Sequence, residues 1–137
     1  MPRIETKDAN GKPNGFLIPI WHVDQGPKID QVYLTTILPG SQKGPHLHLV
    51  RRGFFTCIKG TLLAVWRFDG NYREVQMKEG SQFEVQPGIP VAFYNFGPGE
   101  AYLLNMPSPP WRESEPDEHP VSNWEYEPVM EPASGRY

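Results

Sequence analysis

The chain lacks the features that define several large protein classes. Its single cysteine, Cys57, has no partner for an intrachain disulfide. No stretch approaches the roughly 18 consecutive apolar residues of a membrane-spanning helix, and the mean hydropathy is −0.54. The first residues also lack the apolar core, about 7–15 residues long, of a secretory signal. We therefore expect a soluble protein of the reducing cytoplasm that makes no contact with membranes.

Positive charge is scarce as well. The 13 Lys and Arg residues against 16 Asp and Glu give a net charge of −3, and the basic residues form no dense run. A nucleic-acid-binding surface needs such a cluster, so binding to nucleic acid is not expected. A chain of 137 residues can close one core but not a core plus a separate cofactor domain, which excludes two-domain dehydrogenases and kinases.

Turn-forming residues, in contrast, are abundant. Sixteen prolines and 13 glycines interrupt a chain that is 38% hydrophobic and 12% aromatic, so short strands are expected rather than long helices. The expected strands cover residues 31–38, 52–58, 61–68, 72–77, 82–85, 90–96 and 101–106. Short β-branched and aromatic runs at this spacing predict an all-β sandwich or barrel.

The two ends of the chain differ from its middle. Residues 1–30 are expected to form a polar arm and a first strand, and residues 31–107 the barrel. Residues 108–137 form a Pro-rich acidic tail with few aliphatic side chains, which favours partial disorder. Its large aromatic residues favour the alternative, a tail pinned across the barrel mouth or onto a neighbouring subunit: Trp111, Trp124 and Tyr126. Arm and tail are the elements through which we expect a homodimer to form.

The most informative stretch holds two histidines, His46 and His48. Residues i and i+2 of an extended segment point to the same face, so the two rings are expected to project together. Paired imidazoles act either as metal ligands or in proton transfer. With continuous strand parity Arg52 shares their face, where it either binds an anion or pairs with a carboxylate such as Glu84.

The spacing around this pair resembles the two sequence motifs of the cupins. The first motif is matched by Gly40, His46, His48 and Gly60. The second is matched by Gly80, Gly88 and Asn95, with Pro87 one place off. The resemblance covers residues 40–95 and implies the cupin double-stranded β-helix, an all-β jelly-roll barrel with a pocket lined by inward side chains.

The metal ligands of cupins are only half present. Where metal cupins carry a glutamate and a third histidine, this chain has Arg52 or Gly53 and Val91. Two imidazoles beside a guanidinium suit a divalent cation poorly, so neither a metal nor another cofactor is expected. A metal-dependent cupin dioxygenase or isomerase stays open as an alternative.

Among metal-free cupins, the sequence resembles enzymes of deoxysugar biosynthesis. Their 3,5-epimerases carry Arg-Gly-x-His and their 3,4-ketoisomerases Arg-Gly-x-His-x-His, where this chain reads Lys43-Gly44-Pro45-His46-Leu47-His48. Residues 85–93 are similar to the epimerases' Pro-Gly-x-x-His-x-Phe segment. The resemblance implies an isomerase or epimerase that moves a proton, through an enolate, on a nucleoside-diphosphate-linked 4-keto-6-deoxyhexose.

This reaction suggests roles for particular side chains. His46 is the expected base and His48 its proton-shuttling neighbour, while Tyr94, or else Tyr102, is the nearest substitute for the epimerases' acidic tyrosine. The residues expected to bind substrate are Lys43, Arg52, Arg67, Trp66, Tyr102 and Asn105. For Trp66 and Tyr94, stacking on a nucleobase competes with plain core packing. A non-catalytic cupin that captures a sugar or small anion is a further alternative.

Overall fold

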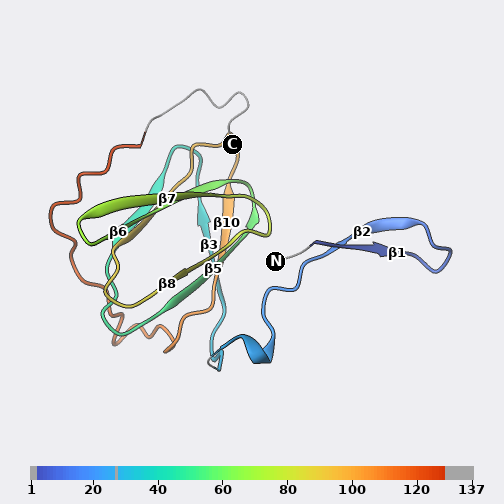
Figure 1. The fold of residues 1–137 in the computed structure, drawn as a ribbon, viewed down its shortest axis with the longest axis horizontal. Coiled ribbons are helices and arrows are strands. Elements are labelled where there is room, and N and C mark those ends of the chain that lie inside the picture. Colours follow the sequence, from blue (N-terminus) through green and yellow to red (C-terminus); the bar gives the residue numbers. More distant parts are fainter. Residues whose placement is uncertain (1–2, 27, 129–137) are drawn as a thin grey trace.

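The computed structural model describes residues 3–26 and 28–128. Figure 1 shows a sandwich of two sheets with a hairpin projecting from one side. The elements are β1 (Ile4–Lys7), β2 (Pro13–Leu17), the short 3-10 turn η1 (Val23–Gln25), β3 (Tyr33–Ile37), β4 (Gln42–His46), β5 (Gly53–Lys59), β6 (Leu62–Phe68), β7 (Asn71–Met77), β8 (Gln82–Val85), β9 (Val91–Tyr94) and β10 (Ala101–Asn105).

Two four-stranded sheets form the sandwich. Their strand orders are β3-β10-β5-β8 and β4-β9-β6-β7, and every neighbouring pair is antiparallel. Consecutive strands therefore alternate between sheets in several places, as in a jelly roll. The expected all-β fold is confirmed. Within the described ranges no helix is long and apolar enough to cross a bilayer.

The core lies between the two sheets. Alternate residues of each strand point inward, as Leu62 and Ala64 do on β6. The outer face of the second sheet is also covered, because Trp124 and Tyr126 of the tail pack against buried residues of β6 and β9. Burial on both faces explains why Leu62–Val65 and Val91–Tyr94 are continuously apolar rather than alternating.

Two residues of the sequence motifs have structural roles at the strand ends. The fully buried Asn95 hydrogen-bonds to the backbone of Ile37, Gly97 and Gly99 and so joins two loops. Gly60 adopts φ +77°, and a Cβ there would lie 2.7 Å from the carbonyl oxygen of Glu100. A side chain at this turn would therefore be excluded both by strain and by contact with the neighbouring backbone.

The ends of the chain depart from part of the expectation. The polar arm and the expected first strand together form one β-hairpin, β1-β2, which ends at Leu17. Over residues 108–128 the tail runs along the sandwich, where Trp124 and Tyr126 pack against buried residues of the second sheet. Hydrogen bonds from Arg67 to the carbonyls of Ser122 and Asn123 hold it there. Residues 129–137 lie outside the described part.

Candidate functional site

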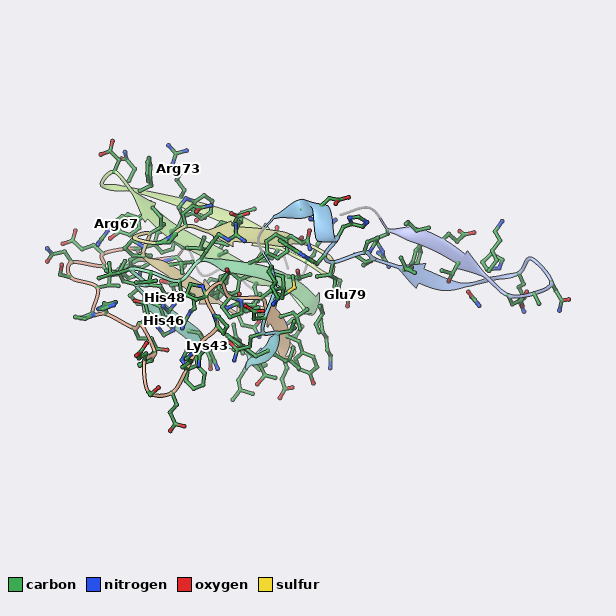
Figure 2. All side chains as sticks on the ribbon, turned by 90° about the horizontal axis from the view of Figure 1, so that it is seen from below. Lys43, His46, His48, Arg67, Arg73 and Glu79 are labelled. Atoms are coloured by element: carbon green, nitrogen blue, oxygen red, sulfur yellow. The ribbon has the colours of Figure 1, made fainter. Side chains whose placement is uncertain are left out.

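A cavity of about 450 Å³ lies between the two sheets and is lined by strands of both sheets and by the tail. Its apolar wall consists of Ile37, Phe55, Val91, Phe93 and Leu103. Its polar and aromatic side chains are Gln31, Tyr33, Thr35, Lys43, His46, His48, Arg51, Trp111 and Glu118. Figure 2 shows Lys43, His46 and His48 grouped together, away from Arg67, Arg73 and Glu79. An apolar wall faced by convergent polar and aromatic side chains is typical of a small-molecule site.

A bulge in β4 brings Lys43 to the same side as His46. The β4-β9 register shifts between these two residues, which are three apart and would otherwise face opposite sides. Gly44 occupies the bulge with φ +91°, and a Cβ there would lie 2.7 Å from the Val91 carbonyl oxygen. The glycine therefore allows the close approach to β9 that turns the Lys43 ammonium toward the histidines.

The two histidine rings lie nearly parallel in the cavity. Their centroids are 6.2 Å apart and their planes differ by 22°. Burial lowers the pKa of His46; Glu118 opposes this shift, and Arg51 and Lys43 add to it. Burial likewise lowers the pKa of His48, against the hydrogen bond to the Asp117 carbonyl. Both rings are therefore neutral at pH 7 and able to accept a proton.

A bend after His48 reverses the expected parity. Arg51, only 5% exposed, lines the cavity, and its Nη2 atom lies 3.1 Å from Nδ1 of His48. The expectation that Arg52 shares the histidines' face is wrong, because its Nη1 atom lies 3.4 Å from Oε1 of Glu84, outside the cavity lining. The guanidinium of the site thus belongs to Arg51, the neighbour of the arginine that strand parity indicated.

The tail supplies the far rim of the cavity. Trp111 lines it while remaining 36% exposed. The backbone N–H of Trp111 donates to Oε1 of Gln31 at 2.8 Å, and Nε2 of Gln31 donates to the Trp111 carbonyl at 3.2 Å. Glu118 adds a carboxylate to the same wall. The two hydrogen bonds between Gln31 and Trp111 hold the indole in place, so that an aromatic face lies at the entrance.

A family model for the cupin domain matches residues 33–107, more than half of the chain. The chain belongs to the cupin family. The matched region runs from β3 to just past β10 and so includes both histidines and the apolar cavity wall. A comparison with curated proteins found no match.

Solved structures show the same fold at low sequence identity. A dTDP sugar isomerase from Desulfovibrio desulfuricans G20 is 19% identical, with TM-score 0.68, over 89% of this cupin and 82% of that chain. NovW, a 4-keto-6-deoxy sugar epimerase from Streptomyces spheroides, is 20% identical, with TM-score 0.67, over 87% and 66%. CapF, a capsular polysaccharide assembling protein from Staphylococcus aureus, is 18% identical, with TM-score 0.62, over 68% of this cupin. This cupin spans only 26% of the CapF chain.

Several side chains expected in the site lie elsewhere in the cupin. Trp66 packs against Phe83, at a second and smaller hollow. Arg67 binds tail carbonyls, and Tyr94 accepts a hydrogen bond from Trp124 on the outer face of the sheet. Tyr102 lies under the ammonium of Lys59. None of these four lines the histidine cavity.

Asn105 acts on the cavity through Tyr33. The buried Asn105 accepts a hydrogen bond from the Phe54 N–H and donates one, 2.7 Å long, to the Tyr33 hydroxyl oxygen. Tyr33 lines the cavity, and its own O–H proton stays available to a ligand because the oxygen accepts the Asn105 hydrogen bond. Sequence patterns single out neither Tyr33 nor Arg51. Tyr33 is an ordinary strand tyrosine, and Arg51 reaches the cavity only because of the bend after His48.

The donor set does not fit a divalent metal. Within residues 3–26 and 28–128, no three His, Cys, Asp or Glu side chains gather as a ligand set. The two imidazoles share the cavity with the cations of Lys43 and Arg51, which lower the pKa of His46 and would repel a metal ion. Proton transfer by the side chains themselves suits this arrangement better.

The histidines make the stability of this cupin depend on pH. Their pKa values in the folded protein lie below 6.5, so the unfolded chain takes up protons first as the pH falls. Their contribution is present above the unfolded pKa and is lost as the pH falls through the folded pKa. We expect a lower Tm at about pH 5 than at about pH 7.5, measured by circular dichroism. The difference should shrink in the double variant His46→Gln/His48→Gln, and an equal difference there would contradict this assignment.

Proposed function

We propose that this cupin is an isomerase or epimerase of a nucleoside-diphosphate-linked 4-keto-6-deoxyhexose. The observation that carries the proposal is the pair of neutral imidazoles in an apolar cavity, accompanied by two cations and by a tyrosine hydroxyl whose proton is available to a ligand. Two of the fold's neighbours, described as a dTDP sugar isomerase and a 4-keto-6-deoxy sugar epimerase, support the same substrate class.

Proton transfer at the carbon next to the ketone is the central step. His46 is the better base, because no group in the described part of the chain hydrogen-bonds to its ring, whereas His48 is bound to the tail. The C–H bond breaks, its proton moves to a nitrogen of His46, and its electron pair forms an enolate. The ammonium of Lys43 stabilises the negative charge on the enolate oxygen.

Return of the proton decides the product. Delivery to the opposite face of the same carbon gives the epimer. A proton shift between the two oxygens of an enediol, followed by protonation of the neighbouring carbon, gives the isomeric ketone. Tyr33 is the side chain suited to donate this second proton, because Asn105 stabilises its oxygen as the proton leaves.

Trp111 gives the nucleotide a place to bind. An exposed indole fixed at the cavity entrance offers a flat face on which a nucleobase stacks. Arg51 and Lys43 carry the positive charge that a diphosphate needs nearby. In this proposal Trp111 takes the role that sequence patterns suggested for Trp66 or Tyr94.

Solvent isotope exchange tests the proposal directly. The protein is incubated in heavy water with dTDP-4-keto-6-deoxyglucose and related sugars, and proton NMR follows the carbons beside the ketone. We expect deuterium at one or both positions, together with epimer or ketoisomer. Binding without exchange for every sugar tried would instead support a non-catalytic sugar-binding cupin. If none of these sugars bound at all, the proposed substrate class would be wrong.

We also infer that two copies pair through the N-terminal hairpin. A lone two-stranded hairpin is marginally stable in water. Among the strands of residues 3–26 and 28–128, β1 and β2 nevertheless pair only with each other, and they expose Ile4, Phe16 and Leu17. Multi-angle light scattering is expected to report a dimer for the full chain. Phe16→Ser should weaken the dimer, and Phe68→Ser, at a similarly exposed phenylalanine on the sandwich, should not.

A further inference from the structure

The tail crosses the cavity mouth as a strap, defined here as residues 107–119. It is fastened to the barrel at several points along its length. The backbones of Arg52 and Ser108 exchange two hydrogen bonds, of 2.8 and 3.0 Å, and His119 donates one to the Leu47 carbonyl at 3.0 Å. Between these points the strap makes its densest contact, through Asp117.

The Asp117 carboxylate fills a nest of three consecutive backbone N–H groups. Leu49 donates to it at 3.1 Å, Val50 at 3.0 Å and Arg51 at 2.8 Å. His119 adds a fourth hydrogen bond through Nε2, at 2.8 Å. Burial would raise the pKa of Asp117, but these hydrogen bonds outweigh it and hold the pKa well below its ordinary range. The nest therefore contains a carboxylate anion at neutral pH.

The Asp117 carboxylate fixes a bend at residues 49–51 that packing in the core does not fix. Leu49 and Val50 are 55% and 65% exposed, so apolar packing does little to fix the backbone between His48 and Arg51. The carboxylate binds the N–H groups of this bend directly. The inward direction of Arg51, three residues after His48, depends on the same bend.

The main chain of Asp117 also touches the site. Its carbonyl oxygen lies 2.6 Å from Nδ1 of His48. A carbonyl only accepts hydrogen bonds, so Nδ1 must carry the proton and Nε2 must keep its lone pair. Nη2 of Arg51 lies 3.1 Å from Nδ1 and 3.4 Å from Nε2, and with the proton on Nδ1 it can donate only to Nε2. Nη1 of Arg51 donates to the Pro116 carbonyl at 2.8 Å.

We infer that Asp117 is a positioning residue that sets the tautomer of His48. Its carboxylate locks the 49–51 bend to the strap, and its carbonyl holds the His48 ring with the proton on Nδ1 and the lone pair on Nε2. A part for His48 in passing the proton on from His46, as expected from the sequence, rests on the proposed function, but the tautomer does not. The strap thereby becomes part of the site rather than a cover over it.

Nitrogen NMR of the histidine rings tests this inference without any substrate. In the ¹⁵N-labelled full chain above neutral pH, two-bond proton–nitrogen correlations are expected to show His48 with a protonated Nδ1. In Asp117→Asn that single pattern should be lost in favour of a tautomer mixture. In Glu115→Gln, which removes one exposed carboxylate from the same strap, the pattern should be unchanged.

Each alternative result is decisive. Finding His48 of the wild-type protein with the proton on Nε2 would overturn the inference, as would an unchanged tautomer in a folded Asp117→Asn. Should that variant fail to fold, the wild-type spectrum alone decides. A fixed Nδ1–H tautomer in a protein that catalyses no exchange would retain the positioning role and reject the proposed function.

Discussion

Replacing His46 with alanine is expected to lower the rate of deuterium incorporation into the keto-sugar by about 10²–10⁴-fold, the usual contribution of a positioned general base. Its ring lines the cavity and makes no hydrogen bond within the described ranges, so its nitrogens remain available to substrate. Its lowered pKa keeps it unprotonated at neutral pH. Alanine removes the proton acceptor and leaves the apolar wall in place.

The rate should fall much more than the affinity. Substrate binding relies on Lys43, Arg51 and Trp111, which the change leaves intact, so the Kd measured by calorimetry should change little. His22→Ala is the matched control, because His22 is exposed at the N-cap of the short turn η1 and does not line the cavity. An exchange rate in His46→Ala within a factor of three of wild type would show that another group removes the proton.

A separate effect of pH is expected on the exchange rate. Because the pKa of His46 is lowered by burial, the base becomes available as the pH rises through that lowered value, and the rate reaches a plateau near neutrality. The arm of the profile on the acidic side therefore reports His46, and it should disappear in His46→Ala.

Strand alternation correctly predicted that the two histidines share a face, but it failed for Arg52, four residues after His48. His46 and His48 share the cavity, as their spacing of two requires. Lys43 and Arg51 reach it only through a bulge before the pair and a bend after it, and parity cannot foresee either. The bend depends on Asp117, more than sixty residues away in the chain, and no local pattern indicates such a contact.

The tail shows the same limit. Its composition, rich in proline and acidic residues, is typical of segments that do not form a core of their own. It does not need one, since Trp124 and Tyr126 use the outer face of the second sheet and Gln31 holds Trp111. The spacing of the barrel strands, in contrast, follows from local turn residues and β-branched runs, and the expected strands recur in the structure within a few residues.

Replacing Asn95 with alanine is expected to destabilise the barrel by roughly 3 kcal/mol, because each buried polar group left unpaired costs about 1–3 kcal/mol. The Asn95 side chain is fully buried. It donates to the Ile37 carbonyl at 2.8 Å and to the Gly99 carbonyl at 2.9 Å, and accepts from the Gly97 N–H at 2.9 Å. For a domain of this size the Tm should fall by about 10 °C.

The loss of stability in Asn95→Ala should leave catalysis unchanged, because Asn95 lies outside the cavity. Asn95 lies at the end of β9 beyond Phe93 and does not line the cavity, so exchange at a temperature where the variant is folded should stay near the wild-type rate. Asn71→Ala is the control, since Asn71 is exposed and its side chain donates a long hydrogen bond, 3.4 Å, to the Asp69 carbonyl. This change should alter stability by less than about 0.5 kcal/mol. If denaturant titration gave the two alanine variants equal stability, the buried amide would not be what joins the β3 and β9 ends, and the loops around the sandwich would owe their shape to packing alone.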